Sequence, residues 1–111
     1  MNIDLNFRNV SPSKFVREYV LKRITHLQRI AGEIVAARVV VLRDAHKTTG
    51  RQYGVRVQLA VAGPDIHASS DDSSLLAAVD RIRDKLAGQL RRRKTRLREH
   101  RATLLETENG R

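Results

Sequence analysis

Apolar and polar residues alternate over residues 2–8, with the period of two that a half-buried β-strand has. Two further segments, 34–44 and 53–61, are rich in β-branched residues or alternate in the same way, and a polar turn separates them. A Gly-Pro turn comes next, and a short strand is expected after it over 66–70. The hydrophobic pattern therefore predicts four strands.

The segment between the first two strands has the period of an amphipathic helix, and we expect this helix over about residues 12–30. Ser11 supplies a cap, and Pro12 occupies the first helical position, where its missing N–H costs nothing. Gly32 is placed to end the helix. On a helical projection, the apolar residues from Phe15 onward form one broad stripe that we expect to be buried.

A second helix is expected after the fourth strand. Asp71, Asp72 and Ser73 are each able to cap its start. Apolar residues then recur at helical spacing to at least Leu97. Arg93 falls inside the apolar arc, which predicts that the helix has passed the edge of the sheet at that point.

The order of elements is therefore β-α-β-β-β-α. A helical crossover lets the first two strands pair in parallel, while the short turns make antiparallel hairpins of the others. We expect a two-layer α+β fold, similar to a double-stranded-RNA-binding domain, in which both helices cover one face of a four-stranded mixed sheet. The chain of 111 residues is one domain in size, which we place at residues 1–101, with a short disordered tail over 102–111.

Charge indicates the kind of partner. Lys and Arg number 22 against 12 Asp and Glu, a formal net charge of +10, which favours a polyanion. Only four aromatic residues are present, so a platform that stacks unpaired bases is poorly supplied. Folded or helical nucleic acid, held through its phosphates and its shape, is the better match.

The basic residues form two rows on the predicted helices. Residues 81–101 contain ten basic and two acidic residues, a net charge of +8. One row lies beside the apolar arc of the second helix and the other flanks the stripe of the first. The candidate contacts are Lys22, Arg23, His26 and Arg29 on the first helix and Arg81, Lys85, Arg91, Arg92 and Arg96 on the second. Since Arg23 falls inside the apolar stripe, it must pair or extend its head into the groove. If the helices pack side by side, the rows converge into one positive groove for a phosphate backbone.

The chain lacks the residues that several other classes of function require. The chain has no cysteine for a disulfide, a thiolate zinc site or a nucleophile. Its four histidines have no metal-ligand spacing, and no glycine-rich phosphate loop is present. No apolar run is long enough to cross a membrane, and the first residues do not form a secretory signal. We therefore expect a cytoplasmic protein that is not an enzyme, with no cofactor, no metal, no membrane contact and no small-molecule substrate.

Two stretches of the chain, together with the order of elements, resemble a known family. The stretch Asp72 to Asp80 and the basic run from Asp84 to Arg92 are similar to the acidic cap, small-residue turn and basic helix of the ribosome hibernation promoting factors. These are also called ribosome-associated inhibitor or sigma-54 modulation proteins. The stretch from Phe15 to Leu27 is similar to the opening helix of the same family. The resemblance covers residues 1 to about 100.

The resemblance implies a protein that occupies the small ribosomal subunit across the mRNA channel and the tRNA sites. Such a protein silences idle ribosomes in stress or stationary phase. Matching positions imply contacts to 16S rRNA from Arg23, His26, Arg29, Lys85 and Arg92. The chain looks like the short form of the family, or a detached N-terminal domain, and is expected to be monomeric off the ribosome.

Two other readings of the basic surface stay open. One is a general double-stranded RNA-binding module, although the lysine cluster that usually opens the last helix of such a module is replaced by Asp71, Asp72 and Ser73. The other is a protein-interaction role, such as modulation of a sigma factor, which only the older family name suggests.

Overall fold

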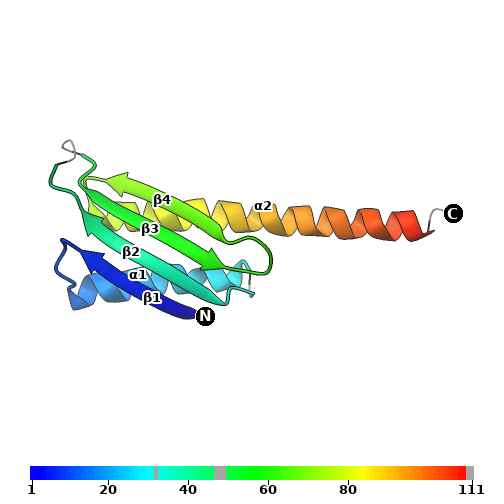
Figure 1. Ribbon diagram of the computed structural model, residues 1–111, viewed down its shortest axis with the longest axis horizontal. Helices are drawn as coiled ribbons and strands as arrows, with labels where there is room; N and C mark the ends of the chain where they lie inside the picture. Colours follow the sequence, from blue (N-terminus) through cyan, green and yellow to red (C-terminus); the bar gives the residue numbers. More distant parts are fainter. Residues whose placement is uncertain (32, 47–49, 110–111) are drawn as a thin grey trace.

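A computed structural model describes residues 1–31, 33–46 and 50–109 of the chain (Figure 1). The predicted order β-α-β-β-β-α is confirmed, with one short 3-10 helix, η1, added after the first helix. The elements are β1 (Asn2–Arg8), α1 (Lys14–Thr25), η1 (His26–Arg29), β2 (Ala36–Arg43), β3 (Tyr53–Ala60), β4 (Ile66–Asp72) and α2 (Leu75–Asn109).

The four strands form one mixed sheet in the order β1-β2-β3-β4. β1 pairs with β2 in parallel, and the pairs β2–β3 and β3–β4 are antiparallel, as predicted. One row across the sheet joins Leu5, Val39, Val57 and Ala68, whose side chains point to the same face. Because β4 ends the order, one of its edges has no strand partner.

Both helices cover one face of the sheet, as Figure 1 shows, and the core lies between the two layers. The largest fully buried side chains come from α1, α2, η1 and the two inner strands: Ile24, Leu27, Leu59, Ile82, Leu86, Leu90, Val20, Val39, Val41, Val55 and Val79. The predicted two-layer α+β fold is confirmed.

α1 begins later than predicted. Ser13, and not Ser11, is the cap, because its Oγ accepts a hydrogen bond from the N–H of Val16 at 3.1 Å. The buried stripe is also narrower than expected, since Phe15 is 64% exposed and packs on the Tyr19 ring instead. The last predicted turn is the 3-10 helix η1. Gly32, the expected end signal, lies outside the described residues.

α2 is capped by Ser74, which the sequence reading overlooked. Its Oγ accepts from the N–H of Ala77 at 3.3 Å, while Oδ1 of Asp72 accepts from the N–H of Ser74 at 3.2 Å. The backbone hydrogen bond from Ser74 is the main cause that lowers the pKa of Asp72. β4 therefore continues two residues beyond its predicted end, through Asp71 and Asp72.

α2 also continues far beyond the sheet, to Asn109 (Figure 1). Between residues 75 and 105, the last buried residue is Leu90, and Leu97 is already 51% exposed. Residues 102–109 are helical, where a disordered tail was expected. The physical reason is that the segment is rich in good helix formers and has no Gly or Pro between Gly88 and Gly110. The domain limit at residue 101 itself stays a prediction.

Candidate nucleic-acid interface

Arg23 on α1 links the two helices through Asp80 on α2. Its Nε lies 3.1 Å from Oδ1 of that carboxylate. The Tyr19 hydroxyl donates to the same oxygen at 2.6 Å and accepts from Nη2 of Arg23 at 3.1 Å. This hydrogen bond and the charge of Asp80 raise the pKa of Arg23 above its ordinary value. The expected pairing of Arg23 is confirmed, and Asp80 balances its charge.

His26 lies among basic side chains from both helices. Burial lowers its pKa below the ordinary value of 6.5, and the charges of Arg29, Lys22, Arg23 and Arg83 lower it further. His26 is half-buried, whereas Lys22 and Arg29 are exposed. We call Lys22, His26, Arg29 and Arg83 the interhelical cluster. The cluster has the positive potential that a phosphate group requires.

Arg83 is a member of this cluster that the sequence reading missed. Its Nη1 lies 3.1 Å from Oδ1 of Asp84, and its Nε is buried without a hydrogen-bond partner in the described part of the chain. A helical projection puts Arg83 about 60° from Asp80, the residue that contacts α1. A helical projection would have predicted that Arg83 faces the first helix only if Asp80 were known to face it, and the sequence does not show this.

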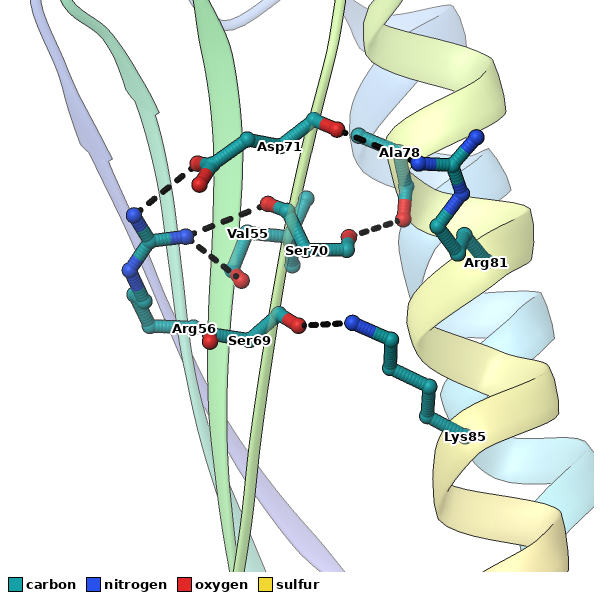
Figure 2. A network of polar contacts seen from close by, with 8 residues as sticks. All are labelled: Val55, Arg56, Ser69, Ser70, Asp71, Ala78, Arg81 and Lys85. Carbon is teal, nitrogen blue, oxygen red and sulfur yellow. Dashed lines mark hydrogen bonds and ion pairs between the residues drawn. The ribbon is translucent and has the colours of Figure 1, made fainter. Parts of the chain in front are cut away.

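Four side chains spaced one turn apart on α2 donate hydrogen bonds to the free edge of β4 and to the turn before it. These donors, which we call the β4 ladder, are Arg81, Lys85, Gln89 and Arg93. Their acceptors, in order, are the carbonyl oxygens of Asp71 (3.4 Å), Ser69 (2.7 Å), His67 (3.2 Å) and Pro64 (3.0 Å). Figure 2 shows the first two of these contacts reaching from α2 to β4. The ladder satisfies carbonyl groups that have no strand partner, and so protects the edge of the sheet.

A second set of contacts fixes the same strand from within. Oγ of Ser70, a buried polar residue at the edge of the core, donates to the carbonyl oxygen of Ala78 at 2.6 Å. On the opposite face of the sheet, Arg56 donates to the carbonyl oxygen of Ser70 at 3.1 Å and to Oδ1 of Asp71 at 2.9 Å (Figure 2). Arg81 also pairs with Asp72 at 3.0 Å. β4 is thus held to α2 from its edge and from its buried face.

The structure separates the two predicted basic rows. Lys22 on α1, and His26 and Arg29 on η1, lie on the side that faces α2. Arg81 and Lys85 point instead to the β4 edge, on the flank of α2 away from α1. The predicted single groove between these rows is therefore not formed by these residues. Arg81 lies about 100° around α2 from Asp80, the residue that contacts α1, and it therefore faces a different side of the helix.

The remaining predicted residues lie on the projecting part of α2, where they are exposed. Arg91 lies about 20° around the helix from Asp80, on the flank that carries the interhelical cluster. Arg92 and Arg96 lie on the opposite flank, beside the turn between β3 and β4. The predicted site residues thus divide between two surfaces of α2.

The described ranges 1–31, 33–46 and 50–109 contain neither a metal-ligand cluster nor a membrane-spanning helix. No group of three or more His, Asp or Glu side chains is arranged there to bind a metal ion. No helix among these residues combines the length and the apolar character needed to cross a membrane.

Two comparisons of the sequence point to one family. The family model described as sigma 54 modulation protein / S30EA ribosomal protein matches residues 3–98. A ribosome hibernation promotion factor of Deinococcus radiodurans is 37% identical over 92 residues, which are 83% of this chain and 48% of that protein. The chain therefore spans about half the length of that relative. The ribosome hibernation promoting factor of Escherichia coli K12 is 31% identical over 100 residues, which are 90% of this chain and 100% of that protein.

Solved structures agree with this result. The N-terminal domain of Thermus thermophilus Protein Y is 30% identical, with a TM-score of 0.72 over 83% of this chain and 98% of that one. A ribosomal subunit interface protein from Coxiella burnetii has the same fold, with a TM-score of 0.75 and 23% identity over 86% of this chain and 99% of that one. The chain belongs to the sigma 54 modulation protein / S30EA ribosomal protein family.

Proposed function

We propose that this protein is a ribosome hibernation factor, which binds the small ribosomal subunit and silences translation in stress or stationary phase. The family membership supports the proposal, since relatives that align over most of this chain are named ribosome hibernation promoting factors. The observation that carries it is the excess of positive charge along α2, with a net charge of +8 over residues 81–101. A surface of this kind binds RNA through its phosphates.

The proposed site on the ribosome is the mRNA channel together with the tRNA sites, where 16S rRNA lines the small subunit. The interhelical cluster is the proposed rRNA contact. Lys22 and Arg29 are exposed and able to pair with phosphate oxygens, and the buried Nε–H of Arg83 has no acceptor in the described part of the chain. Arg23 takes a positioning role in this proposal, because Asp80 already balances its charge.

The interhelical cluster suits folded RNA better than unpaired bases. Of the chain's four aromatic rings, Phe15 and Tyr19 stack on each other at 6.1 Å between centroids, and Tyr19 also holds Arg23. A general double-stranded RNA module is less well supported, because Asp72 and Ser74 open α2 where such a module presents lysines. We further propose a cytoplasmic location and a monomeric state off the ribosome.

Sedimentation of the full chain with ribosomes tests the proposal. We expect the protein to travel with small subunits and whole ribosomes at physiological salt, and to suppress translation in vitro. Added tRNA and mRNA should displace it, because the proposed site overlaps theirs. Recovery only at the top of the gradient would overturn the proposal. Binding that tRNA and mRNA leave unchanged would overturn the proposed location.

A further inference from the structure

The strongest feature outside the interhelical cluster is a groove between the β3–β4 turn and the projecting part of α2. The groove has a volume of about 920 Å³, which lies within the range of about 300–1,000 Å³ that ligand-binding sites have. One wall is the turn from Ala62 to Ile66, and the other is α2 from Gln89 to His100. We call it the turn groove. It lies on the flank of α2 away from α1.

Arg93 joins the two walls. Its Nη1 donates to the carbonyl oxygen of Pro64 at 3.0 Å. Gly63 has a φ of +86°, and a Cβ there would lie only 2.9 Å from Nη2 of Arg93. Glycine therefore both adopts the turn and leaves room for the guanidinium. The contact holds the guanidinium plane of Arg93 in place at the groove.

The helix wall of the groove combines two cations with an apolar side chain. Arg92 and Arg96 are exposed, and within the described residues neither has an acidic partner. Leu97 lies on the same wall and is 51% exposed, although it continues the apolar arc that is buried up to Leu90. The fold itself thus leaves an apolar contact surface uncovered beside two unpaired positive charges.

The turn wall has the opposite charge. Asp65 lines it, and its Oδ2 accepts a hydrogen bond from Nε2 of Gln58 at 2.7 Å, which fixes the carboxylate. A phosphate is repelled by this wall and attracted by Arg92 and Arg96. An elongated anion in the groove is therefore expected to run along α2, with its uncharged parts toward Pro64 and Leu97.

We propose that the turn groove binds a short single-stranded segment of RNA. Phosphates pair with Arg92 and Arg96, and a base packs on Leu97 and Pro64 with the fixed guanidinium of Arg93 available for stacking. A duplex fits less well, because its bases are stacked inside and cannot reach the apolar floor. The choice of RNA as the anion rests on the proposed ribosome binding. α2 would then lie between two RNA segments, one at the interhelical cluster and one at the turn groove.

A matched pair of charge reversals in the full chain tests this inference. Arg96→Glu changes the groove, whereas Arg98→Glu makes the same change about 200° around the helix, at a residue that is also exposed but lies outside the groove. Binding to a labelled single-stranded RNA of five nucleotides is measured by fluorescence anisotropy. We expect Arg96→Glu to weaken binding about tenfold or more and Arg98→Glu about threefold or less.

Two further measurements identify the ligand and separate this inference from the proposed function. Unlabelled single-stranded RNA should compete, while a duplex of the same length and free ATP should compete at least about tenfold less well. Equal losses in the two variants, or preferred binding of the duplex or of ATP, would overturn the inference. Ribosome sedimentation of the wild-type chain is run in parallel. If the wild-type chain sediments with ribosomes but both variants bind the short RNA equally well, only the proposed groove site is refuted. If the short RNA binds in the groove but the wild-type chain does not sediment with ribosomes, only the proposed function is refuted.

Discussion

Nζ of Lys85 donates to the carbonyl oxygen of Ser69 at 2.7 Å and thereby closes part of the free edge of β4. We expect Lys85→Ala to lower the free energy of unfolding by about 0.5–1 kcal/mol, because the carbonyl loses an ionic donor but stays open to water. Urea denaturation measures the change. Lys94→Ala is the control, since Lys94 is an exposed lysine of the same helix outside the β4 ladder. Equal losses in both variants would show that the ladder contact contributes nothing to stability.

The contact between Arg23 and Asp80 predicts a coupling between stability and RNA binding. A double-mutant cycle with Arg23→Ala and Asp80→Ala should give a small favourable coupling energy, because both side chains are more than a third exposed. Asp80→Asn should at the same time strengthen binding to ribosomes at low salt, since it releases the charge of Arg23. Weaker binding by a folded Asp80→Asn variant would contradict this role.

The sequence predicted the fold well and the site only in part. Periodicity identifies every strand and both helices because each buries one face, and the core positions of α2 from Val79 to Leu90 follow directly from the period of 3.6. The division of the basic residues could not be predicted. It depends on how α2 is rotated on the sheet, and that rotation is set by long-range contacts such as those of Asp80 with Arg23 and of Lys85 with Ser69.

The same limit applies to the groove and to the end of the chain. Arg93 was expected beyond the edge of the sheet, but it reaches back to the carbonyl oxygen of Pro64, a contact that needs the turn geometry of Gly63. A disordered tail was expected over residues 102–109 because the sequence there shows no pattern of tertiary contacts that would stabilise a helix. Their intrinsic propensity is enough to continue a helix that α2 has already nucleated.

The environment of His26 predicts a pH dependence. Its pKa in the folded chain lies below the ordinary value of 6.5, so the unfolded chain binds more protons as the pH falls through this value. The contribution of His26 to stability is therefore present above about pH 6.5 and decreases as the pH falls toward the folded-state pKa. A phosphate bound at the interhelical cluster would reverse the unfavourable field and raise this pKa. Affinity for ribosomes should accordingly increase on acidification.

Affinity measured between about pH 5.5 and about pH 7.5 tests this expectation. His26→Gln should flatten the dependence, because glutamine keeps polar contacts but does not titrate. His67→Gln serves as the control, since His67 is exposed on the outer face of β4. A pH dependence that persists in His26→Gln and disappears in His67→Gln would show that His67 causes the effect. It would then contradict phosphate binding beside His26 in the interhelical cluster.

Salt should weaken binding steeply. If about six phosphates are neutralised, the logarithm of the affinity falls with the logarithm of the salt concentration with a slope of about −4 to −5. Each charge removed from the interface should make the slope shallower by about one. Lys22→Ala and Arg29→Ala are suitable because both side chains are exposed and their loss leaves the core intact. A nearly flat response would favour a protein partner, such as a sigma factor, over RNA.

Shortening α2 at two places tests where the folded domain ends. A chain that ends at Arg101 should keep the full free energy of unfolding, because no side chain of α2 from Arg91 to Leu105 is buried. A chain that ends at Gln89 removes Leu90 and the contact of Arg93 with Pro64, and should lose about 2–5 kcal/mol, which is the usual cost of deleting a buried leucine. Urea denaturation measures both. A large loss in the longer chain would mean that residues 102–111 belong to the domain, against the limit predicted at residue 101.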